Sequence, residues 1–335
     1  MSFIDLINER ARKNPKTVVL PESEDERTLR AAAKVMELKT ANLILLGNAD
    51  VIKADALKYG LDLTGVEIVD PEKSEKLEEY VEALTEIRKN KGMTPELARE
   101  ALLNDRTTFA VMMVKQKDAD GLVSGACHST ANTLRPALQI IKTAPGKKLA
   151  SAVFMFDIPN CEFGDDGIIA CADCALTQDP DAEQLAEIGA DTAETYEALM
   201  GKEARVAFLC HSTMGSAKHP FVEKVQEAVK IAKESYPNVL LDGELQLDAA
   251  IVPEVAASKA PNSTVAGKAN VLVFPNIEAG NIGYKLIQRF AKAESYSLIQ
   301  GLAAPVNDLS RGCFWEDIVG VIAITVLQAQ SMEEK

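Results

Sequence analysis

Short apolar runs rich in β-branched residues alternate with longer amphipathic stretches along the whole chain. Runs of this kind predict buried strands, and apolar positions at helical spacing predict helices. Strands are expected at residues 17–20, 42–47, 66–69, 121–124, 149–156, 168–174, 205–210, 239–241 and 271–274. One helix is expected to begin after residue 25 and to run to about residue 38. Others are expected at about 50–59, 73–90, 95–116, 181–200, 219–235 and 280–293. Strands separated by such helices imply βαβ crossovers, and therefore an α/β fold with mainly parallel sheets.

The most informative segment spans residues 307–317 and directly precedes an apolar run at 318–329. It combines a hydroxyl, a guanidinium, a thiol and carboxylates around a glycine, whereas the apolar run predicts a buried helix. If helical geometry reaches back far enough, Ser310, Cys313 and Asp317 share one face of that helix. The alternative is an ordinary serine N-cap with a charged first turn.

At 335 residues the chain is longer than a typical domain with a single hydrophobic core, so two domains are expected. A Pro-Gly turn followed by two lysines predicts a boundary near 145–148. A second junction is expected near 300–310, before the final helix. The pattern alone leaves open whether that helix returns to the first domain.

The formal net charge of −14 argues against sequence-independent nucleic-acid binding, which requires neutralisation of phosphates. It also repels an anionic substrate, so basic side chains would have to gather locally. Six scattered cysteines form no small-protein disulfide framework and are expected to be reduced. With neither a signal peptide nor an apolar run long enough to span a membrane, a cytoplasmic protein without a membrane partner is expected.

Three loops after predicted strands combine hydroxyls, glycine and a basic residue, and lie at 124–136, 211–220 and 275–285. Ligands of open α/β sheets bind at the carboxyl ends of the strands. In the first loop, Ser129 or Thr130 would cap a helix whose free amides favour phosphate, and Arg135 would grip phosphoryl oxygens. The alternative is that these residues serve only the turns.

Other chemistry has little support in the sequence. Neither a Walker motif nor a G-x-G-x-x-G fingerprint occurs, so ATP and NAD are unsupported. Cys171 and Cys174 form a lone C-x-x-C in an apolar run, which favours buried structural thiols. The three histidines lack metal-ligand spacing, and no metal is expected.

Several spaced segments nevertheless resemble the short, single-module phosphate acetyltransferases (phosphotransacetylases) of bacteria and archaea. The matching segments are residues 119–126, 134–141, 242–246, 274–276, 280–281 and 307–313. Phosphate butyryltransferases share the fold and parts of these motifs. The resemblance implies reversible acetyl transfer between acetyl phosphate and coenzyme A, which are substrates together with phosphate. It implies no bound cofactor and a homodimer.

The resemblance further implies two three-layer α/β domains of the isocitrate/isopropylmalate dehydrogenase type, with the active site in the cleft between them. Domain I would hold residues 1–146 and 305–335, and domain II, expected to be the dimerisation domain, residues 147–304.

Catalytic roles carry over from the family to one cluster. Asp317 would be the general base that deprotonates the coenzyme thiol, Ser310 would hydrogen-bond the oxyanion or the thiol, and Arg311 would face the developing charge. Arg135 and Arg88 would contact phosphate or coenzyme. Further binding residues are Ser129, Thr130, Tyr284 and Cys313. Phe314 and Trp315 are bulkier than the resemblance leads one to expect after Cys313.

Three other interpretations stay open at this point. Cys313 or Cys127 would accept the acetyl group first in a ping-pong mechanism. A second possibility is a metabolite-binding regulator that kept the fold, although the intact Ser310, Arg311 and Asp317 argue against it. A dehydrogenase of similar two-domain build is the third.

Overall fold

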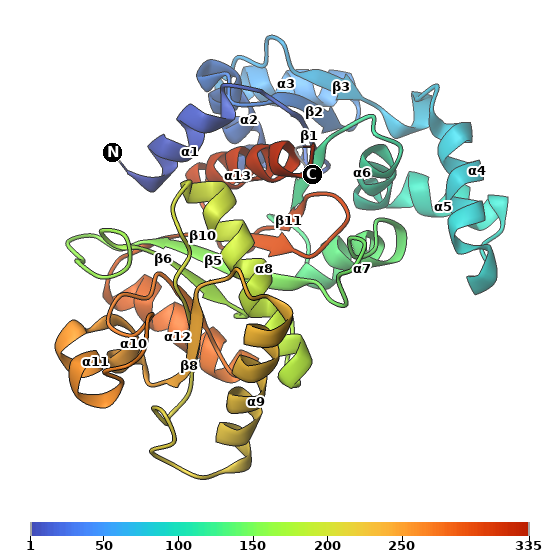
Figure 1. Cartoon of the computed structure of the whole chain (residues 1–335). Coiled ribbons are helices and arrows are strands. Elements are labelled where there is room, and N and C mark those ends of the chain that lie inside the picture. The colour runs from blue at the N-terminus through green and yellow to red at the C-terminus, as the bar shows by residue number, and fades with distance from the viewer. Residues whose placement is uncertain (1, 334–335) are drawn as a thin grey trace. The chain divides into compact units, whose positions relative to one another are not determined.

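The structure, a computed structural model, describes residues 2–333 (Figure 1). The chain divides into two compact units. The first unit holds residues 3–145 and the chain from Leu302 onward, and the second holds residues 146–301.

The first unit is built on a five-stranded sheet in which every pair of neighbouring strands is parallel. Its strands, in spatial order, are β11 (Val306–Asp308), β4 (Gly121–Ser124), β1 (Thr17–Leu20), β2 (Asn42–Leu46) and β3 (Glu67–Val69). The central strands β1 and β4 are almost entirely buried, as the uninterrupted apolar runs predict. The carboxyl ends of β11, β4 and β1 lie side by side at one edge of this sheet.

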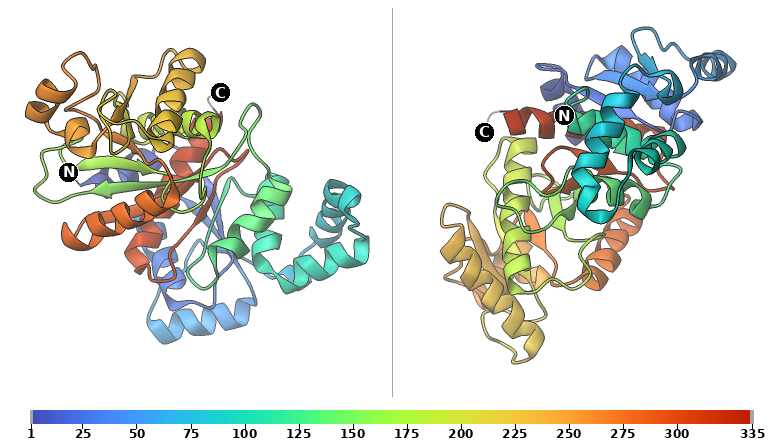
Figure 2. Two further views of the ribbon diagram at one scale, coloured as in Figure 1. Left: turned by 90° about the horizontal axis from the view of Figure 1, so that it is seen from below. Right: turned by 90° about the vertical axis from the view of Figure 1, so that its right-hand side faces the viewer.

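Helices cover this sheet in two groups. In the first group the helices pack together, and α13 makes most of the contacts with the sheet. This group comprises α1 (Phe3–Ala11), α2 (Glu26–Leu38) and α13 (Trp315–Glu333). The second group comprises α6 (Arg106–Lys115) and α7 (Thr130–Ile140). A peripheral pair, α4 (Leu77–Arg88) and α5 (Pro95–Asn104), projects from one side of the unit (Figure 2). The remaining helix of this unit is α3 (Ala49–Tyr59), and short 3₁₀ turns lie at Pro71–Lys73 and Lys89–Lys91.

The second unit contains a six-stranded mixed sheet. Its strands, in spatial order, are β10 (Glu294–Gln300), β5 (Ser151–Asp157), β6 (Ile168–Ala172), β9 (Val271–Val273), β7 (Val206–Leu209) and β8 (Leu241–Leu245). From β6 to β8 the strands are parallel, whereas β5 runs antiparallel to both of its neighbours. The helices are α8 (Ala182–Met200), α9 (Pro220–Ser235), α10 (Leu247–Ile251), α11 (Pro253–Lys259) and α12 (Ile277–Phe290). The predicted α/β class with mainly parallel sheets is confirmed.

Some predicted element boundaries are wrong for local reasons. The helix expected at 95–116 is two helices, because Asp105 adopts an extended conformation and its side chain caps α6 through the N–H of Thr107. The strand expected at 239–241 begins only at residue 241. Strand β10 escaped prediction because Glu, Ser and Tyr interrupt its apolar pattern, and it forms by antiparallel pairing with β5.

The C-terminal helix is buried, as predicted, with every residue from 318 to 327 withdrawn from solvent. It begins at Trp315, so helical geometry does not reach back to Ser310, and the expected shared helical face of Ser310, Cys313 and Asp317 does not form. Among residues 2–333, no helix has both the length and the apolar character needed to cross a lipid bilayer.

Candidate active site

The turn between β11 and α13 carries most of the predicted catalytic residues. Asn307 fixes its start, because the buried side-chain amide donates hydrogen bonds to Thr325 Oγ1 at 2.8 Å and to Gln328 Oε1 at 2.7 Å on α13. Ser310 then closes a tight turn: its carbonyl accepts from the N–H of Cys313 at 2.9 Å, and its Oγ accepts from that of Gly312 at 3.2 Å. The turn is therefore anchored to the core although its tip is exposed.

Asp317 is tied to the same turn from the helix side. Its Oδ2 accepts a hydrogen bond from the backbone N–H of Phe314 at 2.8 Å, in the manner of a residue that completes a helix cap. The side chain is half-buried, and its place in the first turn of α13 favours the charged carboxylate. Ser310 and Arg311 are exposed beside it, and within residues 2–333 the Arg311 guanidinium makes no hydrogen bond or ion pair.

Arg27, which the sequence analysis did not single out, joins three loops of the first unit. One guanidinium nitrogen, Nη1, donates to the carbonyls of Arg311 at 2.9 Å and Cys313 at 3.0 Å. The other, Nη2, donates to the carbonyl of Ala126 at 2.8 Å and to the Asp25 carboxylate at 2.7 Å. The guanidinium thus holds the turn of Ser310 next to the loop that leads into α7. The fork of fixed N–H donors makes arginine suited to this role.

The first predicted anion loop already holds a carboxylate from the protein itself. Glu22 is 2% exposed. Its Oε2 accepts from the N–H groups of Gly125 and Ala126 at 2.9 and 2.8 Å, and its Oε1 from those of Cys127 and His128 at 2.9 and 3.1 Å. The N–H groups of residues 125–128 are therefore bound to Glu22 and are not free for phosphate. The predicted phosphate-binding amides lie further on, at the start of the following helix, and that role stays a prediction.

Gly125 is required for a close approach of its loop to the neighbouring loop after β11. Its φ is +108°, and an added Cβ would lie 2.4 Å from Asp308 Oδ1 and 2.6 Å from the backbone nitrogen of Leu309. No side chain fits there. Burial raises the pKa of Asp308 to about 6, against the opposing effect of the Thr130 and Thr133 hydroxyls.

The start of α7 presents the other predicted phosphate contacts. Ser129 occupies the N-cap position, but its hydroxyl makes no capping hydrogen bond, contrary to expectation. Ser129, Thr130 and Arg135 are all exposed. Their polar groups are accessible at the end of the unit where the turn of Ser310 lies, since Arg27 binds Ala126 and Arg311 together.

Two predicted binding residues belong to other elements, α4 and α12. Arg88 is the last residue of α4, a helix that packs against α7. Tyr284 belongs to α12 of the second unit, where its ring stacks on Phe154 with centroids 4.3 Å apart and burial raises its pKa. Their roles in binding stay predictions.

The two candidate nucleophilic cysteines are poor thiolates. Burial raises the pKa of Cys127 to about 12, and its Sγ donates to Asp25 at 3.2 Å. Burial also raises the pKa of Cys313 to about 11, although the nearby Arg27 guanidinium opposes the shift. Both are protonated at neutral pH, which disfavours the acetyl-cysteine route because the thiolate is the nucleophile. Cys171 and Cys174 are buried free thiols, as predicted.

In the second predicted loop, at 211–220 in the other unit, a glutamate of the protein also binds loop residues. Buried Glu244 accepts from Ser212 Oγ at 2.8 Å and from the N–H of Gly215 at 2.6 Å. In the third loop, Asn276 caps α12 through its bond from the N–H of Ala279 at 3.0 Å. Neither loop offers the open row of amides that its sequence indicates.

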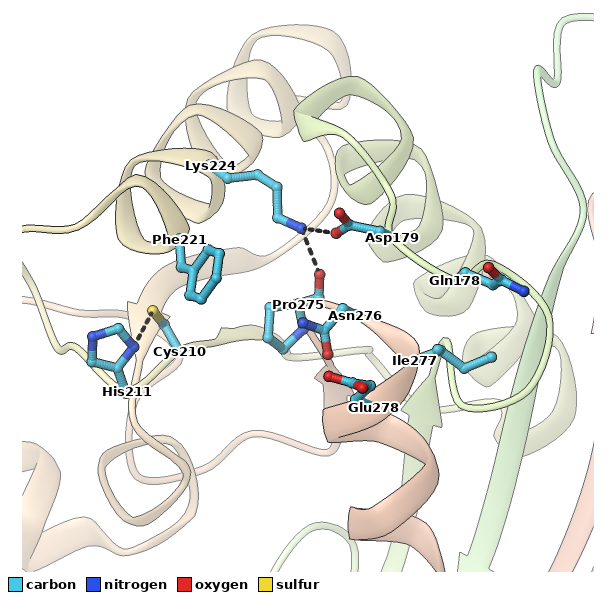
Figure 3. Close-up of a pocket in the computed structure, with 10 residues that line it drawn as sticks. All are labelled: Gln178, Asp179, Cys210, His211, Phe221, Lys224, Pro275, Asn276, Ile277 and Glu278. Atoms are coloured by element: carbon cyan, nitrogen blue, oxygen red, sulfur yellow. Dashed lines mark hydrogen bonds and ion pairs between the residues drawn. The ribbon is translucent and has the colours of Figure 1, made fainter.

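A cavity of about 590 Å³ lies in the second unit, between the loops after β6, β7 and β9 (Figure 3). Its one lysine, Lys224, donates to Asp179 at 2.7 Å and to the carbonyl of Pro275 at 2.9 Å (Figure 3). Glu278 adds a further negative charge. Because its cation is already paired, the cavity is poorly suited to a phosphoryl group. Among residues 2–333, no cluster of three or more His, Cys, Asp or Glu side chains has metal-binding geometry.

Comparison with known proteins decides the family. A family model described as "Phosphate acetyl/butaryl transferase" matches residues 2–326. The chain belongs to this family. It is similar to the phosphate acetyltransferase of Acetivibrio thermocellus, with 56% identity over 331 residues that cover 98% of this chain and 99% of that protein. The phosphate acetyltransferase of Thermoanaerobacterium thermosaccharolyticum is also 56% identical, over 98% of this chain and 100% of that protein.

A solved structure gives the same result. The crystal structure of a phosphotransacetylase from Streptococcus pyogenes matches with a TM-score of 0.92 and 44% identity, over 99% of this chain and 100% of that chain. The resemblance drawn from the sequence motifs is confirmed, and this member of the phosphate acetyl/butaryl transferase family is an acyltransferase.

Proposed function

We propose that the enzyme transfers an acetyl group reversibly between acetyl phosphate and coenzyme A, by direct attack of the coenzyme thiolate in a ternary complex. The names of its relatives support the reaction, since two full-length relatives at 56% identity are phosphate acetyltransferases. Such attack needs a base for the thiol and positive charge near the carbonyl and phosphoryl oxygens. It needs no bound cofactor and no metal.

Three residues of the turn before α13 supply the catalytic groups. A free thiol has a pKa of about 8.5, so removal of its proton by Asp317 increases the fraction of attacking thiolate. Arg311, exposed and unpaired among residues 2–333, faces the oxygen on which charge grows during attack. Ser310 hydrogen-bonds the oxyanion or the thiol. Cys313 lines the turn as a neutral thiol.

Phosphoryl oxygens are held by side chains at the start of α7. Arg135 provides a bidentate grip, and the hydroxyls of Ser129 and Thr130 add hydrogen bonds. Arg88 and Tyr284 contribute further contacts to phosphate or coenzyme. The amides of residues 125–128 do not contribute, because Glu22 occupies them.

The observation that carries the proposal is the clamp formed by Arg27. It bonds to the carbonyls of both Ala126 and Arg311, and so brings the phosphate-binding residues of α7 to the catalytic turn within one compact unit. Because Asp25 pairs with the Arg27 guanidinium, the positive charge that attracts an anionic substrate to a chain of net charge −14 comes from the exposed Arg311 and Arg135.

Initial rates measured by thioester absorbance test the proposal. Acetyl phosphate and coenzyme A should give intersecting double-reciprocal lines, and the Cys127→Ala, Cys313→Ala double variant should retain its activity. Parallel lines together with a trappable acetyl-cysteine would establish the ping-pong route instead. Acetyl, propionyl and butyryl phosphates compared side by side decide the acyl group, and a clear preference for butyryl phosphate would make the enzyme a phosphate butyryltransferase.

The cellular setting and assembly belong to the same proposal. A cytoplasmic location is supported by six cysteines that are all free thiols. A homodimer formed through the second unit is supported by α12, which exposes Ile282, Leu286 and Phe290 at four-residue spacing. Light scattering of the wild type and of a Leu286→Glu variant tests the dimer: a monomeric wild type would contradict it.

A further inference from the structure

We infer that Glu22 is a positioning residue for substrate: its carboxylate takes the place of an anion in the loop 125–128 and thereby sets the phosphate-binding start of α7. The inference rests on the proposed function for its kinetic consequence. Glu22 lies 103 positions before Gly125, the first residue whose amide it binds.

The two oxygens of Glu22 are fully engaged. Besides the four backbone amides, Oε1 accepts from His128 Nδ1 at 2.7 Å, which gives five donors around one carboxylate. Consecutive N–H groups that converge in this way form an anion-binding concavity. Because Glu22 is 2% exposed, solvent cannot replace these bonds if the carboxylate is lost.

The backbone around Glu22 is also held by contacts outside the loop. The neighbouring Ser23 donates from Oγ to the carbonyl of Leu46 at 2.6 Å, and Asp25 caps α2 through the N–H of Arg27. The carboxylate is therefore presented by a segment with its own anchors, and its partner is the glycine-containing loop 125–128. That loop ends one residue before Ser129, so its conformation sets where the hydroxyls of Ser129 and Thr130 and the first turn of α7 point.

Glutamine cannot substitute for Glu22 at this position. An amide has one oxygen that accepts and one nitrogen that only donates, so the Glu22→Gln side chain would turn its NH₂ group toward one pair of backbone N–H groups. The loop would have to move to relieve that contact. The matched control is Glu24→Gln, because Glu24 lies two residues after Glu22 in the segment between β1 and α2 and is exposed. Among residues 2–333 it pairs only with Arg106.

Steady-state kinetics separate positioning from a merely structural role. Glu22→Gln should raise the KM for acetyl phosphate about tenfold or more, with a much smaller change in the KM for coenzyme A, since a displaced binding group weakens one substrate selectively. Glu24→Gln should match the wild type. In an Arg135→Gln background the Glu22→Gln penalty should shrink, because residues that act through one another are not additive. An unchanged KM for acetyl phosphate, or full additivity, would overturn the inference.

Amide hydrogen exchange supplies a readout that does not need activity. The amides of residues 125–128 should exchange much faster in Glu22→Gln than in the wild type and in Glu24→Gln, and equal exchange would overturn the inference even if the wild type transferred no acetyl group. Should Glu22→Gln fail to fold, His128→Ala removes one of the five donors and keeps the carboxylate. Its KM for acetyl phosphate should rise in the same direction by a smaller factor, and an unaltered value would again contradict the role.

Discussion

Two loops rich in glycine and hydroxyl residues, one in each unit, enclose a buried glutamate, but the two loops differ in what surrounds them. Glu22 fills the first loop and Glu244 fills the second. The first is further joined by Arg27 to the turn that exposes Arg311. The second borders a cavity whose lysine is already paired with Asp179. The contrast shows that an internal carboxylate makes either loop rigid, whereas function depends on the side chains placed around it.

The largest effect expected from this contrast concerns Arg311. Arg311→Gln should lower kcat by about 10²–10³, because it removes positive charge from the position where the transition state gains negative charge. Its side chain makes no bonds within residues 2–333, so the free energy of unfolding should change little. Steady-state rates and urea denaturation measure both quantities, with the exposed Arg12→Gln as a control for net charge. A kcat within a few-fold of the wild-type value would show that Arg311 does not stabilise the transition state, and would contradict the assignment of the chemistry to the first unit.

Arg27→Met should have the next largest effect. Loss of the clamp releases the Ser310 turn from the loop of Ala126 and leaves carbonyls unsatisfied, which should lower the free energy of unfolding by about 2 kcal/mol or more. The kcat/KM should fall about tenfold, because the two loops are no longer held together.

Arg30→Met is the matched control for that change. Arg30 lies one turn along α2 and, within residues 2–333, pairs only with Glu26. This surface ion pair contributes about 0.5 kcal/mol. If both variants behaved alike, the clamp would have no special role.

Asp308, which packs against Gly125 of the first loop, should make the free energy of unfolding depend on pH. Its pKa in the folded protein is about 6, above the value of about 3.9 expected on unfolding. Protonated Asp308 therefore favours the folded state below about pH 4, and this contribution is lost as the pH rises through 6. The free energy of unfolding of Asp308→Asn minus that of the wild type should therefore rise by on the order of 3 kcal/mol from pH 4 to pH 7. Denaturation curves across that range give the difference, and a flat difference would contradict the assigned burial effect.

The smallest kinetic effect is expected in the second unit. Glu244→Gln disturbs the bonds from Ser212 and Gly215 and should lower the free energy of unfolding by about 1–3 kcal/mol. Both KM values should stay within about twofold of the wild type, in contrast to Glu22→Gln. A tenfold rise in the KM for acetyl phosphate would place the second loop in the substrate site and end the distinction between the loops.

The sequence predicted the parts of this fold that depend on local pattern. The apolar run after Asp317 specified a buried helix, and alternating strands and helices specified parallel sheets. Strand β10 was missed because its mixed polar pattern becomes a strand only by pairing with β5. The break at Asp105 was missed because one capping side chain outweighed a continuous helical pattern.

For the candidate site, the sequence indicated the residues but misjudged how the loops are held. Glycine, serine and threonine after the strands indicated the loops, but not the carboxylates of Glu22 and Glu244 that bind their backbone. Such pairings cannot be read from one sequence, because Glu22 and Gly125 are more than one hundred residues apart. Arg27 was missed for the same reason, since its partners come from three separate segments.

The most direct test of the account is the turnover of Asp317→Asn in the acetyl phosphate and coenzyme A assay. Asparagine still offers an oxygen to the N–H of Phe314, so the cap of α13 is kept while the base is lost. The account expects kcat to fall by about 10²–10⁴ with an unchanged melting temperature, and the neighbouring Glu316→Gln to behave as the wild type. A folded Asp317→Asn enzyme with wild-type turnover would contradict the assignment of the general base.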